Sequence, residues 1–183
     1  MDALRGAAVL AVIAWHVVSV PSLFGLPMHA WIHTAFELLE PVRMPLMFVL
    51  SGMLLPHALT KPWSAYAMGK LRNILWPYAV WMVLTCAALG SLASLTAPWT
   101  LIGGAFHLWF LAVLLACFAL GVVTRWVPPL LLAAAMLATL WLGDFSTHAV
   151  NRFLYWGAFF FLGAALWRHR DAIAGFRPWF PVV

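Results

Sequence analysis

Ionisable side chains lie inside long apolar stretches of this chain, where burial makes each of them costly. The first stretch carries Arg5 and His16, eleven residues apart. An α-helix turns about 100° per residue, so both side chains fall on one face, roughly 16 Å apart along the axis. Histidine has an unperturbed pKa of about 6.5 and can give or take a proton at neutral pH. His16 is therefore a candidate general base.

A second apolar stretch carries further polar side chains, and helical geometry orders them by depth. If the chain turns back after the first stretch, Arg43 lies near the depth of His16, and Ser51 lies near the level of Arg5. Pro45 removes a backbone donor and can open the helix where a substrate would sit. Arg43 and Ser51 are therefore candidate substrate-binding residues.

The polar groups fall into two tiers across a predicted membrane. The inner tier suits the binding of phosphates and contains Arg5, Ser51, Lys70 and Arg72. The outer tier suits proton transfer and contains His16 and Arg43, flanked by Glu37, Glu40 and His107. An ionisable group inside a membrane costs roughly 2.5–3.5 kcal/mol on insertion scales, so each buried one is a candidate functional residue.

Each of these residues also has a structural explanation. Glu40 and Arg43 are three residues apart on one helical face and can simply neutralise each other. Lys70 and Arg72 can serve only to orient the chain in the membrane. His16 can be a packed side chain with its hydrogen bonds satisfied, and a Ser-Gly pair at 51–52 can serve only close helix packing.

The composition requires the elements that position these residues to be membrane helices. Of 183 residues, 66% are hydrophobic and 8% are charged, whereas soluble domains carry about 25% charged residues. A bilayer accepts such a surplus of apolar surface. The predicted fold is all-α, a polytopic bundle of about six transmembrane helices. The expected spans are 3–23, 35–55, 74–95, 108–123, 130–142 and 149–167.

Basic residues gather beside alternate spans and predict how the bundle is oriented. Lys and Arg occur after the second, fourth and sixth spans, and none occurs after the first or third. The positive-inside rule then places both termini in the cytoplasm. The net charge of +5 is thus orientation charge, and we expect no nucleic-acid partner. Cys86 and Cys117 lie in apolar runs, so we expect neither a disulfide nor a metal site.

Four of these segments resemble motifs of the acyltransferase 3 family of membrane O-acyltransferases. Residues 2–6 followed by His16 are similar to the family's Arg-x10-His first helix. Residues 43–52 resemble the second-helix signature of fucose 4-O-acetylase-like members. Residues 70–78 and 107–111 resemble the third-helix and fourth-helix motifs, although the family often has Arg-x-x-Arg where this chain has Lys70 and Arg72.

The resemblance implies transfer of an acyl group, in the simplest case acetyl, from cytoplasmic acyl-CoA to a hydroxyl of a cell-surface saccharide. The protein would lie in a bacterial cytoplasmic membrane with lipid around it. His16 would be the catalytic base, and Arg5 would be its essential partner. The other expected roles are substrate binding by Arg43, Ser51, Glu40 and His107, and acyl-CoA binding by Lys70 and Arg72. Acyl-CoA is a substrate here, and no permanently bound cofactor is expected.

The resemblance covers the front of the family's membrane domain, because family members usually have a longer chain with more helices. We therefore expect residues 1–183 to form one acyltransferase-like domain that is incomplete at its C-terminal end. Two other functional classes stay open: a small transporter whose intramembrane His and Arg line a substrate path, and an inactive truncated scaffold. The sequence leaves the oligomeric state open.

Overall fold

The computed structural model is helical, with no strand in the part of the chain that it describes, which is residues 2–23, 25, 29–103, 108–143, 145 and 147–175. The elements are α1 (Asp2–Leu23), α2 (Ala30–Gly52), α3 (Leu55–Leu59), α4 (Trp63–Lys70), the π-helical turn η1 (Leu71–Leu75), α5 (Trp76–Ala88), the 3₁₀ turn η2 (Leu92–Thr96), α6 (Pro98–Gly103), α7 (Trp109–Val123), α8 (Pro129–Leu142), α9 (His148–Arg168) and α10 (Arg170–Gly175). The all-α prediction is confirmed for these residues.

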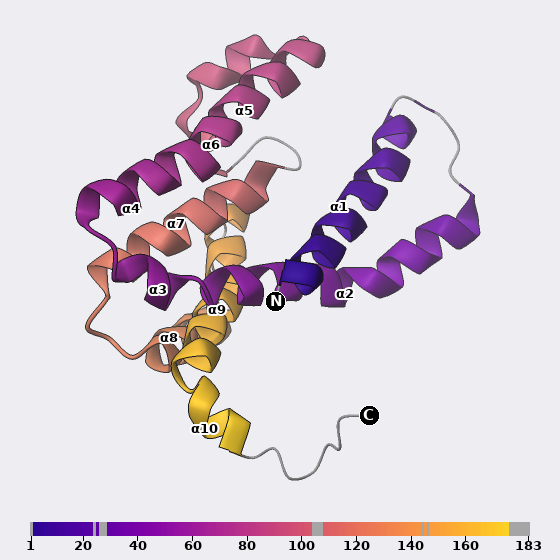
Figure 1. The fold of residues 1–183 in the computed structure, drawn as a ribbon. Coiled ribbons are helices and arrows are strands. Elements are labelled where there is room, and N and C mark those ends of the chain that lie inside the picture. Colours follow the sequence, from indigo (N-terminus) through magenta and orange to yellow (C-terminus); the bar gives the residue numbers. More distant parts are fainter. Residues whose placement is uncertain are drawn as a thin grey trace.

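Helix α9 lies at the centre of the arrangement and packs against α8, α2 and α7. Helix α1 packs against α2, and in Figure 1 α1 and the N-terminal half of α2 diverge on the right, whereas the C-terminal half of α2 crosses α9. The core around α9 is aromatic: Phe48, Phe160 and Phe161 are fully buried, and Phe118 meets Phe160 edge to face with centroids 4.9 Å apart. This core fixes the C-terminal half of α2, which carries several of the candidate residues.

The crossing of α2 and α9 depends on two glycines. A Cβ atom on Gly52 would overlap the carbonyl oxygen of Phe160, and one on Gly163 would overlap the carbonyl oxygen of Val49. Small residues allow this close backbone approach between membrane helices. Gly52 therefore serves close helix packing, which is the structural explanation given above for the Ser-Gly pair at 51–52.

The observed helices correct the limits of two predicted spans. The span predicted at 74–95 is too long, because α5 ends at Ala88 and the chain then turns at Gly90, whose φ of +65° favours glycine. The same helical region begins earlier, at Trp63, and continues through η1. The span predicted at 35–55 begins earlier, at Ala30, and α2 ends at Gly52 before a short turn leads to α3. Met53 and Leu54 continue the apolar run through the first turn, and leucines resume directly after Gly90 and Ser91 in the second, so hydropathy alone misplaces these ends.

Two stretches of the described chain are long and apolar enough to cross a membrane, Ala30–Leu59 and His148–Arg168. Shorter apolar helices cover Val9–Pro21, Trp109–Val123 and Pro129–Leu142. The number of six crossings and the cytoplasmic location of both termini stay predictions.

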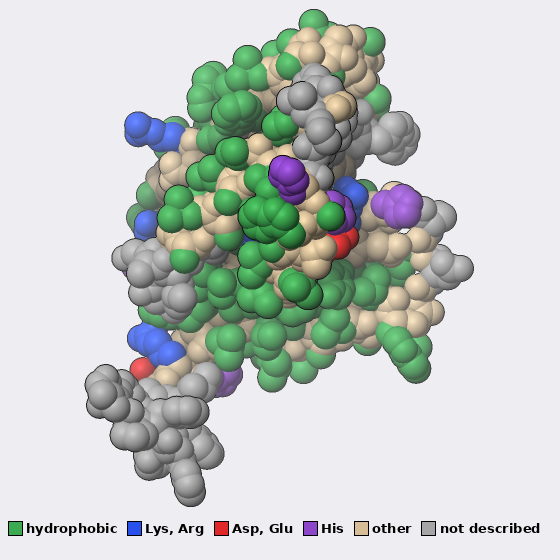
Figure 2. All heavy atoms as spheres, turned by 90° about the vertical axis from the view of Figure 1, so that its right-hand side faces the viewer, with side chains coloured by type: hydrophobic (Ala, Val, Ile, Leu, Met, Phe, Trp, Pro, Cys, Tyr) green, Lys and Arg blue, Asp and Glu red, His purple; other side chains and the backbone are tan. Residues whose placement is uncertain are grey.

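The outer surface of the helices is rich in large apolar side chains. On α1 Leu10 and Val17 are exposed, and on α8 Leu131, Trp141 and Leu142 are exposed. Figure 2 shows hydrophobic side chains spread over one whole face, with Lys, Arg, Asp and Glu in few places on it. A large continuous apolar surface marks contact with a membrane or a partner, and the composition of this chain favours the membrane.

Candidate active site

A cavity of about 340 Å³ lies between α1, α2 and α7. Its lining is mostly apolar and aromatic, with His16 and Arg43 as the two ionisable members. The remaining lining residues are Val9, Val12, Ile13, Trp15, Met44, Met47, Trp109, Phe110 and Leu111. The structure thus brings together the two outer-tier residues that helical depth predicts to lie at one level.

His16 is partly buried and is oriented by its own helix. Its Nδ1 lies 2.7 Å from the carbonyl oxygen of Val12, one turn earlier in α1. A carbonyl oxygen only accepts, so this contact assigns the proton to Nδ1 and leaves the lone pair of a neutral imidazole on Nε2. In this tautomer Nε2 can take a proton from a bound hydroxyl group.

Arg43 is held between α1 and α2 with its side chain 8% exposed. Its guanidinium carbon lies 5.4 Å from the ring centroid of Trp15, and Trp15 in turn contacts Phe36 at a centroid distance of 5.3 Å. A guanidinium over an indole face is attracted by the ring quadrupole. This contact positions a cation on the wall of the His16 cavity.

The remaining predicted site residues do not line this cavity in the described structure. Some lie elsewhere, and the side chains of others are outside the part that the structure describes. Ser51 is half-buried about 12 Å further along α2 than Arg43, near the crossing with α9. Arg5 belongs to α1 and Glu40 to α2, but their side chains lie outside the described part of the structure. His107 also lies outside the described residues.

Lys70 lies in a different hollow, a groove of about 320 Å³ between α4 and α7. Its Nζ lies 3.1 Å from the ring centroid of Phe118 and 5.5 Å from that of Tyr66. The Tyr66 hydroxyl donates a hydrogen bond of 2.9 Å to the carbonyl oxygen of Phe118, which fixes α4 on α7. Arg72 follows on η1 and is exposed. The basic residues expected to bind acyl-CoA are therefore separate from the His16 cavity.

Burial lowers the pKa of Lys70 to about 8, and the positive charge of Lys61 adds a smaller lowering effect. Lys70 is the last residue of α4 and lies outside the two stretches that are long and apolar enough to cross a membrane. A lysine with this pKa is still mostly protonated at neutral pH. It can therefore bind a phosphate group at pH 7 and loses that ability at higher pH.

Arg152, near the start of α9, is a basic residue beside the site that is not among the residues predicted from the sequence. Its guanidinium carbon is 5.4 Å from the ring centroid of Trp109, a residue that lines the His16 cavity. Trp109 also contacts Trp156, which stacks on Phe48 with centroids 5.5 Å apart. An arginine inside a predicted span is the same signal that identifies Arg43, so it could have been found.

A family model describing an acyltransferase domain, that of the acyltransferase 3 family, matches residues 1–183. The chain belongs to the acyltransferase 3 family. The match covers the whole chain and confirms the resemblance drawn from the four motifs. No curated protein and no solved structure gives a significant match to this sequence. Membership of the acyltransferase 3 family indicates membrane acyltransferase activity and agrees with the apolar helices of the fold.

Proposed function

We propose that this chain is a multi-pass protein of a bacterial cytoplasmic membrane that transfers an acetyl group from cytoplasmic acetyl-CoA to a hydroxyl of a cell-surface saccharide. The observation that carries the proposal is the cavity in which His16 and Arg43 meet. The family match supplies the reaction class, and the hydrogen bond from His16 to Val12 orients the imidazole that would act as the base.

The reaction follows from the chemistry of these groups. The acceptor hydroxyl gives its proton to Nε2 of His16 while its oxygen forms a bond to the thioester carbonyl carbon. The carbonyl oxygen becomes negative, and the Arg43 guanidinium on the same cavity wall can stabilise that charge. The C–S bond then breaks, and the thiolate of CoA receives the proton from His16. The products are the acetyl ester and free CoA.

In this proposal the inner tier of polar residues binds the acyl-CoA donor, and the outer tier binds the acceptor. Lys70 and Arg72 bind the CoA phosphates near the cytoplasmic surface. Arg5, roughly 16 Å from His16 along α1, and Ser51 assist them at the inner end. Glu40 and His107 contribute to acceptor binding. The apolar and aromatic lining around His16 excludes water, which favours attack by the saccharide over hydrolysis.

The test is transfer of radiolabelled acetyl groups from acetyl-CoA into lipid-linked or surface glycan by membranes that contain this chain. His16→Asn is the informative variant, because the asparagine amide can still donate to the Val12 carbonyl but cannot act as a base. We expect incorporation to fall by about 10²–10⁴-fold. His57→Asn is the matched control, since His57 is exposed on α3.

Two results would contradict the proposal. Equal incorporation by the wild-type chain and His16→Asn would remove His16 from the chemistry. Absence of incorporation by an inserted, intact wild-type chain would favour the inactive scaffold, and uptake of a saccharide without acetylation would favour the transporter.

A further inference from the structure

A further cavity lined by basic residues lies at the end of α9 that carries Arg168, and it shares no lining residue with the His16 cavity. It has a volume of about 240 Å³ and lies between α3, the end of α7, the start of α8 and the end of α9. Its lining includes two arginines, Arg125 and Arg168, over an apolar floor that contains Leu55, Leu132 and Phe161. The proposed function uses neither arginine.

The two arginines come from different elements and line the same space. In the described part of the chain the salt bridges join His33 to Glu37 and Arg170 to Asp171, so Arg125 and Arg168 take part in none of them. Both side chains are exposed, and an anion in the cavity that they line is attracted by both positive charges. Arginine suits phosphate in particular, because its planar guanidinium donates two parallel hydrogen bonds.

The backbone at this cavity adds positive potential. Pro129, the first residue of the 14-residue helix α8, lines the cavity, but proline has no N–H, and the N–H groups of Leu131 and Leu132 donate to the Pro128 carbonyl oxygen. The N-terminus of a helix carries partial positive charge and favours anions. The Thr124 hydroxyl donates to the Leu120 carbonyl at 2.7 Å, so its proton is already used within the helix. Arg125 and Arg168 are therefore the groups that would donate hydrogen bonds to an anion, and the α8 terminus adds only its partial charge.

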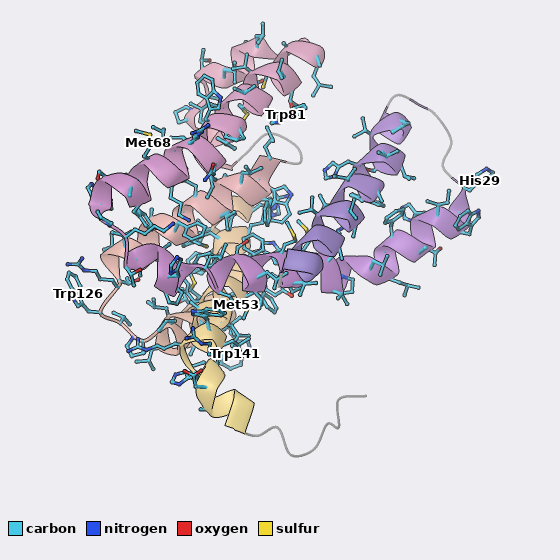
Figure 3. The ribbon with its side chains drawn as sticks, viewed as in Figure 1. His29, Met53, Met68, Trp81, Trp126 and Trp141 are labelled. Atoms are coloured by element: carbon cyan, nitrogen blue, oxygen red, sulfur yellow. The ribbon has the colours of Figure 1, made fainter. Side chains whose placement is uncertain are left out.

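Tryptophans mark the level of the cavity in the membrane. Arg125 lies over the ring of Trp126 at 4.3 Å, and Trp126 projects from the α7–α8 turn at the edge of the molecule (Figure 3). Arg168 follows Trp167 at the end of α9. Tryptophan is enriched at the boundary between hydrocarbon and headgroups. In the proposed orientation this end of the bundle faces the cytoplasm, where the leaflet is rich in anionic lipids.

We propose that the cavity between α3, α7, α8 and α9 is a binding site for a phosphate group, which Arg125 and Arg168 hold above an apolar floor. Its volume lies below the roughly 300–1,000 Å³ of pockets that enclose a drug-sized ligand. It therefore fits a phosphate with the first part of an attached chain. Two molecules could present that group from the cytoplasmic side: an anionic phospholipid and the CoA moiety of the acyl donor.

The test measures binding, so its outcome does not depend on acyl transfer. Native mass spectrometry of the purified full chain in detergent would count bound phosphatidylglycerol and, separately, bound phosphatidylcholine. The test variant is R125Q/R168Q, and the matched control is K61Q/R170Q, which removes two positive charges outside this cavity. We expect wild type and control to prefer phosphatidylglycerol at least about tenfold, and R125Q/R168Q to lose that preference.

A second arm distinguishes the source of the phosphate by titrating CoA and 3′-dephospho-CoA. Loss of CoA binding in R125Q/R168Q, with lipid binding unchanged, would support the phosphate site and assign it to the donor. Equal affinity of the wild-type chain for both lipids, together with unchanged CoA binding in R125Q/R168Q, would overturn the proposal. The thermal midpoint of each variant is measured as a control, and a midpoint equal to that of the wild-type chain shows that lost binding does not come from lost folding.

Discussion

Replacing Gly52 by alanine tests whether the close crossing of α2 and α9 holds the fold together. The new Cβ would overlap the Phe160 carbonyl oxygen and come within 3.1 Å of the Phe160 Cα, so backbone atoms have to move. Overpacking of this kind costs about 1–3 kcal/mol. For a chain of this length, that lowers the thermal midpoint by about 2–12 °C.

The assay uses the two buried free cysteines, Cys86 and Cys117, which react with a thiol-sensitive dye only when the protein opens. Gly69→Ala is the matched control, because nothing lies within 4 Å of a Cβ at that helical position. Alanine is a better helix former than glycine by about 1 kcal/mol, so the control should be as stable as wild type or more stable. If the thermal midpoints of Gly52→Ala and Gly69→Ala both lie at or above that of the wild-type chain, the described packing of α2 on α9 is wrong.

Three further predictions address single contacts. Arg43→Lys keeps the charge but loses the planar group over Trp15, so we expect kcat/KM for the acceptor to fall about tenfold, a loss of about 1–2 kcal/mol. Wild-type kinetics in that variant would indicate that Arg43 only neutralises Glu40. Because the pKa of Lys70 is about 8, its charged fraction drops from about 0.9 at pH 7 to about 0.1 at pH 9, and the KM for acyl-CoA should rise up to about tenfold. Lys70→Arg should flatten this rise, and a flat profile in the wild-type enzyme would exclude phosphate binding by Lys70. Tyr66→Phe removes the hydrogen bond to the Phe118 carbonyl and should lower the free energy of unfolding by about 0.5–1.5 kcal/mol in a denaturant titration. The exposed Tyr155→Phe should leave that free energy unchanged, and equal effects of the two substitutions would contradict the assigned bond.

The meeting of His16 and Arg43 could be predicted from the sequence because it depends on local geometry. Two helices joined by a short connection run back along each other, and the helical rise then gives the depth of each side chain. The cavity shared by these residues agrees with that expectation. The helix limits at Gly52 and Ala88 could not be predicted in the same way, because apolar residues follow Gly52 directly and resume within a few residues after Ala88.

The surroundings of Lys70 and Arg125 depend on contacts between distant parts of the chain. Lys70 lies over Phe118, and Arg125 shares a cavity with Arg168, in each case more than forty residues away in the sequence. Such contacts depend on how α4 and α9 pack on α7, and a hydropathy pattern carries no information about that packing. The sequence therefore identifies these residues as basic and near span ends, and the structure shows which of them share a cavity.

Chemical rescue of His16→Ala by imidazole is a direct test of His16 as the catalytic base. The substitution removes the ring from a cavity of about 340 Å³, which leaves room for a free imidazole to enter. Acetyl transfer would be measured with the purified chain in proteoliposomes, at saturating acetyl-CoA and increasing imidazole. We expect a loss of about 10²–10⁴-fold in His16→Ala and a saturable partial recovery with imidazole. A rate equal to that of the wild-type chain, with no response to imidazole, would contradict the assignment of His16 as the base.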